Sequence, residues 1–163
     1  RSALATGRYP HNTGVLGLAH GHFGWNLNKK IHHISRYFSD HDYATVLFGL
    51  QHITYQEEFL GFDKIFPERP ADDVVKNIKD NLNDRFLKKT FYAEINFFEP
   101  HRPFDFGGVK PSKSKGVFIP KYIPSNSKSR KEFASMQGAI KKMDESILEI
   151  IKILKKKIFM KIQ

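Results

Sequence analysis

Residues 43–50 read YATVLFGL, a compact apolar run that ends in Gly49-Leu50 and is typical of a buried strand. A second run, TFYAEINFF at residues 90–98, is rich in β-branched and aromatic residues and also predicts a strand. Between them, residues 71–89 predict a helix, because apolar residues recur there at spacings of three and four: Val75, Ile78, Leu82 and Phe86. Two strands separated by a helix predict an α/β sheet with crossover helices.

The flanking segments add shorter elements and one long helix. Residues 1–7 predict a short helix, residues 33–41 a further helix, and residues 59–66 contain a candidate edge strand. Residues 128–157 predict an amphipathic helix whose apolar stripe we expect to face the core: Phe133, Met136, Ile140, Met143, Ile147, Ile150 and Leu154. Before it, residues 99–127 hold five of the eight prolines and form a long loop of the kind that is more often functional than filler.

The composition limits the classes of protein that this chain can represent. Its 163 residues, 40% of them hydrophobic, are enough for one domain with a sizeable core. No run of 18 apolar residues is present, so no membrane span is predicted. We also predict no metal ligand, because cysteine is absent, the carboxylates lack a cation-site pattern, and the adjacent His32 and His33 point apart in a helix or a strand.

The net charge of +10 is confined to the last third of the chain. Residues 1–109 carry 13 basic and 13 acidic side chains, whereas residues 110–163 carry 14 basic and 4 acidic ones. One interpretation is a lysine-rich, solvated helix face. Another is a surface that attracts a polyanion. Nucleic acid is not predicted as a partner, because basic and aromatic residues are not interleaved and no nucleic-acid-binding motif is present.

Basic side chains follow both predicted strands. His52 comes just after the first strand and His101 just after the second, and ligands of open α/β sheets bind beyond the carboxyl ends of the strands. Together with Arg1 they form a cationic, hydrogen-bond-donating set suited to an anion such as sulfate or phosphate. A lone histidine beyond a strand more often caps a loop, and we interpret Arg8 as a structural salt-bridge partner.

Several motifs resemble those of the sulfatase family in the alkaline-phosphatase-like superfamily. RSALATGR at residues 1–8 resembles the second half of the first sulfatase signature, and DYATVLFGLQH at residues 42–52 resembles the second signature. FEPHRPF at residues 98–104 is similar to the family's Pro-His-x-Pro-Phe segment, and Met143-Asp144 matches a common family pattern. Order and spacing agree over nearly the whole chain. The first and third motifs look most like the heparan N-sulfatase (sulfamidase) branch.

The resemblance implies a partial alkaline-phosphatase-like sandwich, a mixed, mostly parallel sheet flanked by helices and truncated at both ends. It implies a sulfuric ester or sulfamate hydrolase that acts on a sulfated sugar or glycosaminoglycan-type glycan. Arg1, His52 and His101 would be catalytic and, with Arg102, would bind substrate. The formylglycine nucleophile would lie four positions before Arg1, and the calcium ligands would also lie outside this chain, so we expect residues 1–163 to be one internal fragment of a catalytic domain. Export to the periplasm, cell exterior or lysosome is implied as well.

Three positions depart from the family pattern. Leu50 stands where the second signature has lysine, Gln51 where it usually has tryptophan or a similar residue, and Asp42 where it has glycine. Losing a cation from an occluded sulfate site costs roughly 2–4 kcal/mol of transition-state stabilisation. These departures support an alternative function, a non-catalytic sulfatase remnant that binds anionic glycans through its basic C-terminal third.

Overall fold

The computed structural model describes residues 1–20, 22 and 24–159. Their contacts divide the chain into two compact units, each made of two segments. The first unit combines Arg1–Glu68 with Asn81–Asn96, and the second combines Arg69–Asp80 with the chain from Phe97 onward. Among the described residues, no helix is both long enough and apolar enough to cross a membrane.

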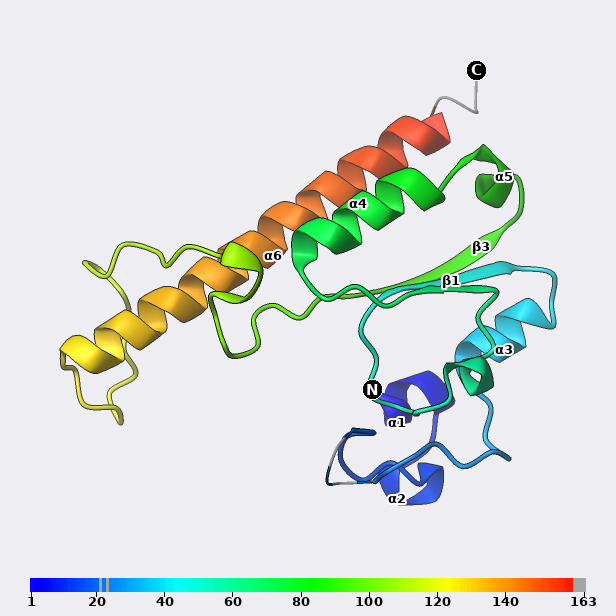
Figure 1. Ribbon diagram of the computed structural model, residues 1–163, viewed down its shortest axis with the longest axis horizontal. Helices are drawn as coiled ribbons and strands as arrows, with labels where there is room; N and C mark the ends of the chain where they lie inside the picture. Colours follow the sequence, from blue (N-terminus) through cyan, green and yellow to red (C-terminus); the bar gives the residue numbers. More distant parts are fainter. Residues whose placement is uncertain (21, 23, 160–163) are drawn as a thin grey trace. The chain divides into compact units, whose positions relative to one another are not determined.

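The first unit is built on a parallel sheet (Figure 1). Within the described residues this sheet has three strands in the order β2-β1-β3, namely Lys64–Phe66, Ala44–Gly49 and Phe91–Asn96. The register pairs β1 with β3 from Ala44 opposite Phe91 to Gly49 opposite Asn96. The predicted α/β fold is therefore confirmed, with β2 as the edge strand expected within residues 59–66.

Short helices complete the first unit: α1 (Ser2–Thr6), α2 (Pro10–Thr13), α3 (Ile34–Ser39), the 3-10 helix η2 (Glu57–Leu60) and α5 (Asp84–Leu87). The central strand β1 is the most deeply buried, as its apolar run predicts, and Leu47 and Phe48 are each 1% exposed. A core cluster joins α1, β1 and η2 with the loops between them: Ala5, Val15, Leu27, Leu47, Ile53 and Leu60. Burying such aliphatic side chains stabilises the fold by about 1.5–3 kcal/mol each.

The prediction of one helix over residues 71–89 is wrong. Helix α4 covers Ala71–Asn81, and α5 starts afresh at Asp84. The interruption has a local cause at Asn83, whose backbone is extended (φ −92°, ψ 176°) and whose side chain accepts a hydrogen bond from the Phe86 amide at 3.2 Å. Asparagine at a helix N-cap competes with continuation of the preceding helix, which apolar spacing alone does not reveal.

The second unit pairs α4 with the long helix α6 (Ser127–Phe159), and the two lie side by side in Figure 1. Lys142 of α6 makes an ion pair with Asp72 of α4, and Lys157 Nζ donates to the Lys79 carbonyl at 2.9 Å. The loop from β3 to α6 contains one short 3-10 helix, η3 (Phe106–Gly108).

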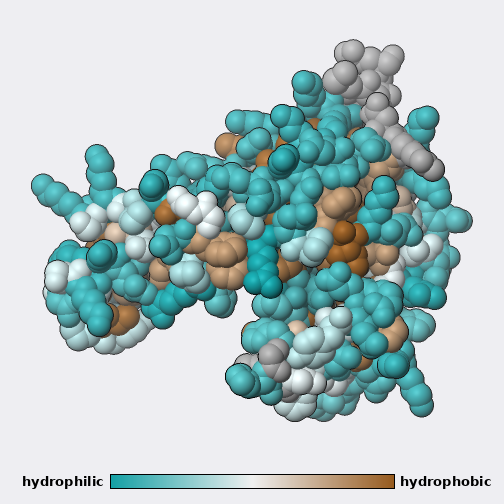
Figure 2. Space-filling model, viewed as in Figure 1, coloured by the Kyte–Doolittle hydropathy of each residue, from teal (hydrophilic) through white to brown (hydrophobic). Residues whose placement is uncertain are grey.

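The apolar stripe predicted for α6 is only partly buried. Ile140 and Ile147 are 41% and 40% exposed, so the expectation that the whole stripe faces the core is wrong. The helix instead buries a face made mostly of small residues: Ala134, Gly138, Ala139, Ser146 and Ile150. The reason is close backbone packing, because a Cβ added at Gly138 would lie 2.2 Å from the Lys110 carbonyl oxygen. Figure 2 shows mainly hydrophilic residues over the part of α6 in view.

Candidate functional site

The carboxyl end of β1 is shaped by Gly49. Its φ is 90°, in the left-handed region, and an added Cβ would lie 1.7 Å from the Asn96 carbonyl oxygen on β3. Only glycine therefore allows the chain to leave the sheet here, and residues 50–52 begin at the edge where ligands of open α/β sheets bind.

The loop after β1 is held in shape by Gln51. Its Oε1 accepts hydrogen bonds from the amides of Ile53 at 2.7 Å and Thr54 at 3.1 Å, and its Nε2 donates to the Thr54 carbonyl at 2.8 Å. These three bonds make Gln51 a structural residue of the loop. The next residue, His52, accepts a hydrogen bond at its carbonyl oxygen from the Ala19 amide at 3.0 Å.

Arg1 reaches the same loop from the start of α1. Its Nη1 donates to the Leu50 carbonyl at 3.5 Å, and Ser2, which follows it, is buried and accepts a hydrogen bond from Thr13 at 3.3 Å. Two of the residues selected from the sequence, Arg1 and His52, therefore belong to one edge of the first unit. The exposed guanidinium gives this edge a cationic group in contact with solvent.

His20 is a neighbour that the sequence did not single out. Its ring lies edge-on to that of His52, with the centroids 5.0 Å apart. It comes from the glycine- and histidine-rich stretch at residues 15–30, which has no regular period. The only indication of His20 in the sequence is that this stretch is rich in histidine.

His101 and Arg102 lie in the second unit, after a cis Glu99–Pro100 bond. The exposed His101 ring contacts the Arg102 carbonyl oxygen through Nδ1 and packs 5.0 Å from the Phe98 ring. The Arg102 guanidinium binds Glu132 of α6, with 2.6 Å between Nη2 and Oε1. Arg102 is thus already paired with a carboxylate.

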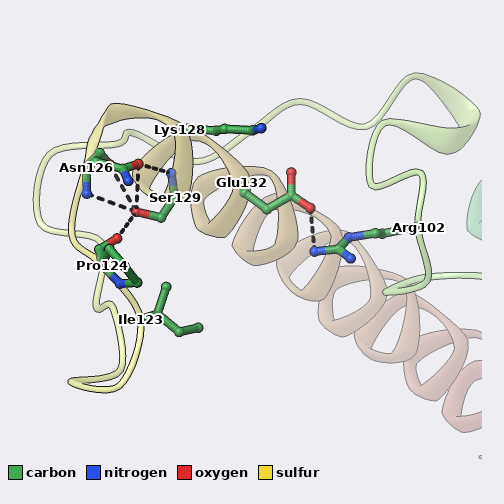
Figure 3. A pocket seen from close by; sticks show the side chains of 7 residues that line it. All are labelled: Arg102, Ile123, Pro124, Asn126, Lys128, Ser129 and Glu132. Atoms are coloured by element: carbon green, nitrogen blue, oxygen red, sulfur yellow. Dashed lines mark hydrogen bonds and ion pairs between the residues drawn. The ribbon is translucent and has the colours of Figure 1, made fainter.

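Arg102 and Glu132 also line a cavity of about 560 Å³ at the start of α6 (Figure 3). Its other lining residues are Ile123, Pro124, Asn126, Lys128 and Ser129. Asn126 and Ser129 cap the helix here, since Asn126 Oδ1 accepts from the Ser129 amide at 2.9 Å. These capping bonds are internal to the helix end.

Glu99, within the segment that resembles a sulfatase motif, is a buried carboxylate that the sequence did not reveal as important. It is 4% exposed, and its Oε1 accepts from the Ala71 amide, the first residue of α4, at 3.1 Å. A carboxylate is stabilised at a helix N-terminus, so Glu99 fixes the segment that leads to His101. Its partner is 28 positions away in the chain, and no local pattern signals such a contact.

A second buried titratable group sits beside β3 in the first unit. His33 is 1% exposed, its Nδ1 lies 2.8 Å from Ser35 Oγ, and its Nε2 lies 3.6 Å from Glu94 Oε2. Burial lowers the pKa of His33 and outweighs the opposing effect of Glu94. Burial and the same carboxylate raise the pKa of Tyr92 to about 12. His33 is therefore a neutral core histidine.

The described residues do not form a calcium site of their own. Among them, no group of three or more His, Cys, Asp or Glu side chains is placed to hold a metal ion. The carboxylates described above have other roles, since Glu99 caps α4 and Glu94 accepts a hydrogen bond from Asn96 Nδ2 at 2.9 Å.

These features define an α/β protein in which a histidine-bearing loop and the Arg1 guanidinium lie together at the carboxyl edge of a parallel sheet. Its structure is similar to that of a sulfatase from Bacteroides thetaiotaomicron, solved in work on the metabolism of multiple glycosaminoglycans, with 18% identity and a TM-score of 0.73. It is also similar to the carrageenan sulfatase Ps i-CgsB, solved with k-i-k-neocarrahexaose, with 17% identity and a TM-score of 0.62. No protein-family model and no curated protein matches the sequence.

The two likenesses show that the chain has a sulfatase-like, partial alkaline-phosphatase-like fold. The aligned regions cover 95% and 96% of this chain but 45% and 44% of the two solved chains. The chain therefore spans less than half the length of the structures that it resembles.

Proposed function

We propose that this chain is part of a sulfatase-like hydrolase that removes sulfate from a sulfated sugar or glycan. The observation that carries the proposal is the placement of the Arg1 guanidinium against the loop that bears His52, at the carboxyl edge of the sheet in a sulfatase-like fold. His101 is a third candidate, which comes from its motif at residues 98–104.

The chemistry of sulfate transfer fits these side chains. Sulfate spreads its negative charge over several oxygens, and a guanidinium presents a planar set of N–H donors that binds two of them at once. A histidine beside the departing group can give a proton to the leaving oxygen or nitrogen. In this proposal Arg1 binds the sulfate oxygens and His52 protonates the leaving group.

The test is an NMR titration of the full chain with glucosamine N-sulfate, glucosamine 6-sulfate and unsulfated glucosamine. We expect the sulfated sugars to shift the ring C–H signals of His52, and Arg1→Gln to weaken binding about tenfold because one charge-assisted contact is lost. His41→Ala serves as a matched control, since His41 is an exposed histidine at the end of α3. The proposal would be overturned if unsulfated glucosamine bound as tightly as the sulfated sugars, or if Arg1→Gln bound the sulfated sugars as tightly as the parent.

Leu50 offers a gain-of-function test at the same loop. The resemblance places a sulfate-binding lysine at this position, and the side chain here is half-buried. Leu50→Lys should strengthen binding of the sulfated sugars several-fold and leave unsulfated glucosamine unaffected. An unchanged affinity would show that this loop does not face the sulfate.

The type of sulfate bond and the compartment follow from the resemblance alone. Residues 1–8 and 98–104 look most like the sulfamidase branch, so we propose that the sulfamate is preferred over the ester, in an exported protein. Tighter binding of glucosamine N-sulfate than of the 6-sulfate supports this preference, and the reverse order opposes it.

A second candidate function is a non-catalytic protein that binds anionic glycans. The observation in its favour is that residues 110–163, with 14 basic and 4 acidic side chains, carry the whole net charge of +10. This function predicts binding of a sulfated glycan that is unaffected by replacement of Arg1 or His101. The same titration therefore separates the two candidates.

A further inference from the structure

The second unit contains a cavity whose lining is rich in lysine. It has a volume of about 620 Å³ and lies between the loop at residues 107–113 and the face of α6 around Gly138. Its charged lining residues are Lys110, Lys113, Lys141, Lys142, Asp72 and Glu145.

Backbone contacts hold the loop against the helix. The Ser112 amide donates to the Ala134 carbonyl at 2.9 Å, and Gly138 allows the Lys110 carbonyl to approach so closely that an added Cβ would lie 2.2 Å from it. The wall that carries Lys110 and Lys113 is therefore fixed by main-chain packing.

The cavity carries an excess of positive charge. Lys142 is paired with Asp72, and Lys141 lies 3.7 Å from Glu145. In the described part of the chain, none of the ion pairs involves Lys110 or Lys113, and both are exposed. Four cations against two carboxylates leave two positive charges that are not neutralised locally.

We propose that this cavity binds a stretch of a sulfated glycan, with Lys110 and Lys113 contacting its sulfate groups. The class of ligand rests on the proposed function, but the location does not, because none of Arg1, His52 and His101 lines the cavity. A concave site holds an oligosaccharide better than a flat charged face does, and the backbone of the loop and the Ser112 side chain offer polar partners for hydroxyl groups.

The test measures binding of a heparin hexasaccharide to the full chain by calorimetry in about 50 mM salt, where exposed charges are weakly screened. We expect the double variant Lys110→Ala/Lys113→Ala to bind about five- to tenfold more weakly, since each exposed ion pair contributes modestly. The matched control is Lys152→Ala/Lys155→Ala, which removes the same charge from exposed positions of α6 outside the cavity. It should change the affinity less than twofold.

Equal losses of affinity in the two double variants would show that the hexasaccharide binds to a diffuse basic surface, and would overturn the proposal that it binds in the cavity. The inference would also fail if a desulfated hexasaccharide bound as tightly as the heparin hexasaccharide. It would fail as well if a DNA duplex competed as effectively as a sulfated glycan, because the site would then not be selective for glycans. The proposed function is tested separately, by the shifts of the His52 ring signals with glucosamine N-sulfate. If those shifts persist in Lys110→Ala/Lys113→Ala while hexasaccharide binding is unchanged, the cavity inference fails and the proposed function stands.

Discussion

Gly49→Ala tests the close approach that forms the candidate site. The substitution adds one methyl group where β1 ends, at a backbone φ of 90°. The new Cβ would lie 1.7 Å from the Asn96 carbonyl oxygen, on the strand that pairs with β1 at this very position. Relief requires that β3 or the end of β1 moves by more than an ångström.

Two costs contribute to the expected loss of stability. Holding an L-residue in the left-handed region costs roughly 1–2 kcal/mol. Overpacking in a well-packed region adds typically about 1–3 kcal/mol. We therefore expect a loss of about 2–5 kcal/mol in the free energy of unfolding, a large share of the roughly 5–15 kcal/mol of a typical domain.

Gly7→Ala is the matched control, because Gly7 also has a positive φ of 64° but an added Cβ there meets nothing within 4 Å. The free energy of unfolding of this variant should fall by about 1–2 kcal/mol, which is the cost of the left-handed backbone conformation alone. Urea unfolding followed by circular dichroism measures both variants. If Gly49→Ala is no less stable than Gly7→Ala, the packing of Gly49 against Asn96 is not what shapes this edge.

Three further predictions concern other parts of the chain. Burial lowers the pKa of His33, so the unfolded state binds more protons than the folded state below about pH 6.5. The free energy of unfolding should therefore fall by at most about 1.4 kcal/mol per pH unit as the pH drops through that range. The urea midpoints at pH 7.5 and pH 5.5 should differ less in His33→Gln than in the parent, and an equal difference in both proteins would contradict this. Asp42 has a φ of 63°, a left-handed backbone conformation that strains any residue with a side chain. Asp42→Gly should therefore raise the free energy of unfolding by about 0.5–1 kcal/mol. A lower melting temperature in this variant would show that the backbone at Asp42 is not strained. On α6, Ile150 is 5% exposed and Ile147 is 40% exposed. Ile150→Ala should therefore lower the free energy of unfolding, measured in urea, by about 2–5 kcal/mol, and Ile147→Ala should lower it clearly less. Equal losses in the two variants would mean that the side chain of Ile147 is also covered.

The sequence by itself determined the parallel α/β framework of the first unit. The apolar runs at residues 43–50 and 90–98 are rich in β-branched and aromatic residues, which favours strands, and they form the buried strand β1 and the half-buried strand β3. It also located His52 just beyond a strand, since the order of residues fixes which side chains follow a strand end. The concentration of positive charge in residues 110–163 is likewise a property of composition.

Only the tertiary structure decided which surfaces are covered and which polar groups are paired. Apolar spacing in α6 identifies a stripe, but the close approach of the Lys110 carbonyl to Gly138 decides that a small-residue face is buried instead. Glu99 caps a helix 28 residues away, and His33 meets Glu94 across 61 positions of chain. Local sequence patterns report the propensities of neighbouring residues, whereas these contacts depend on chain segments that meet only when the fold is complete.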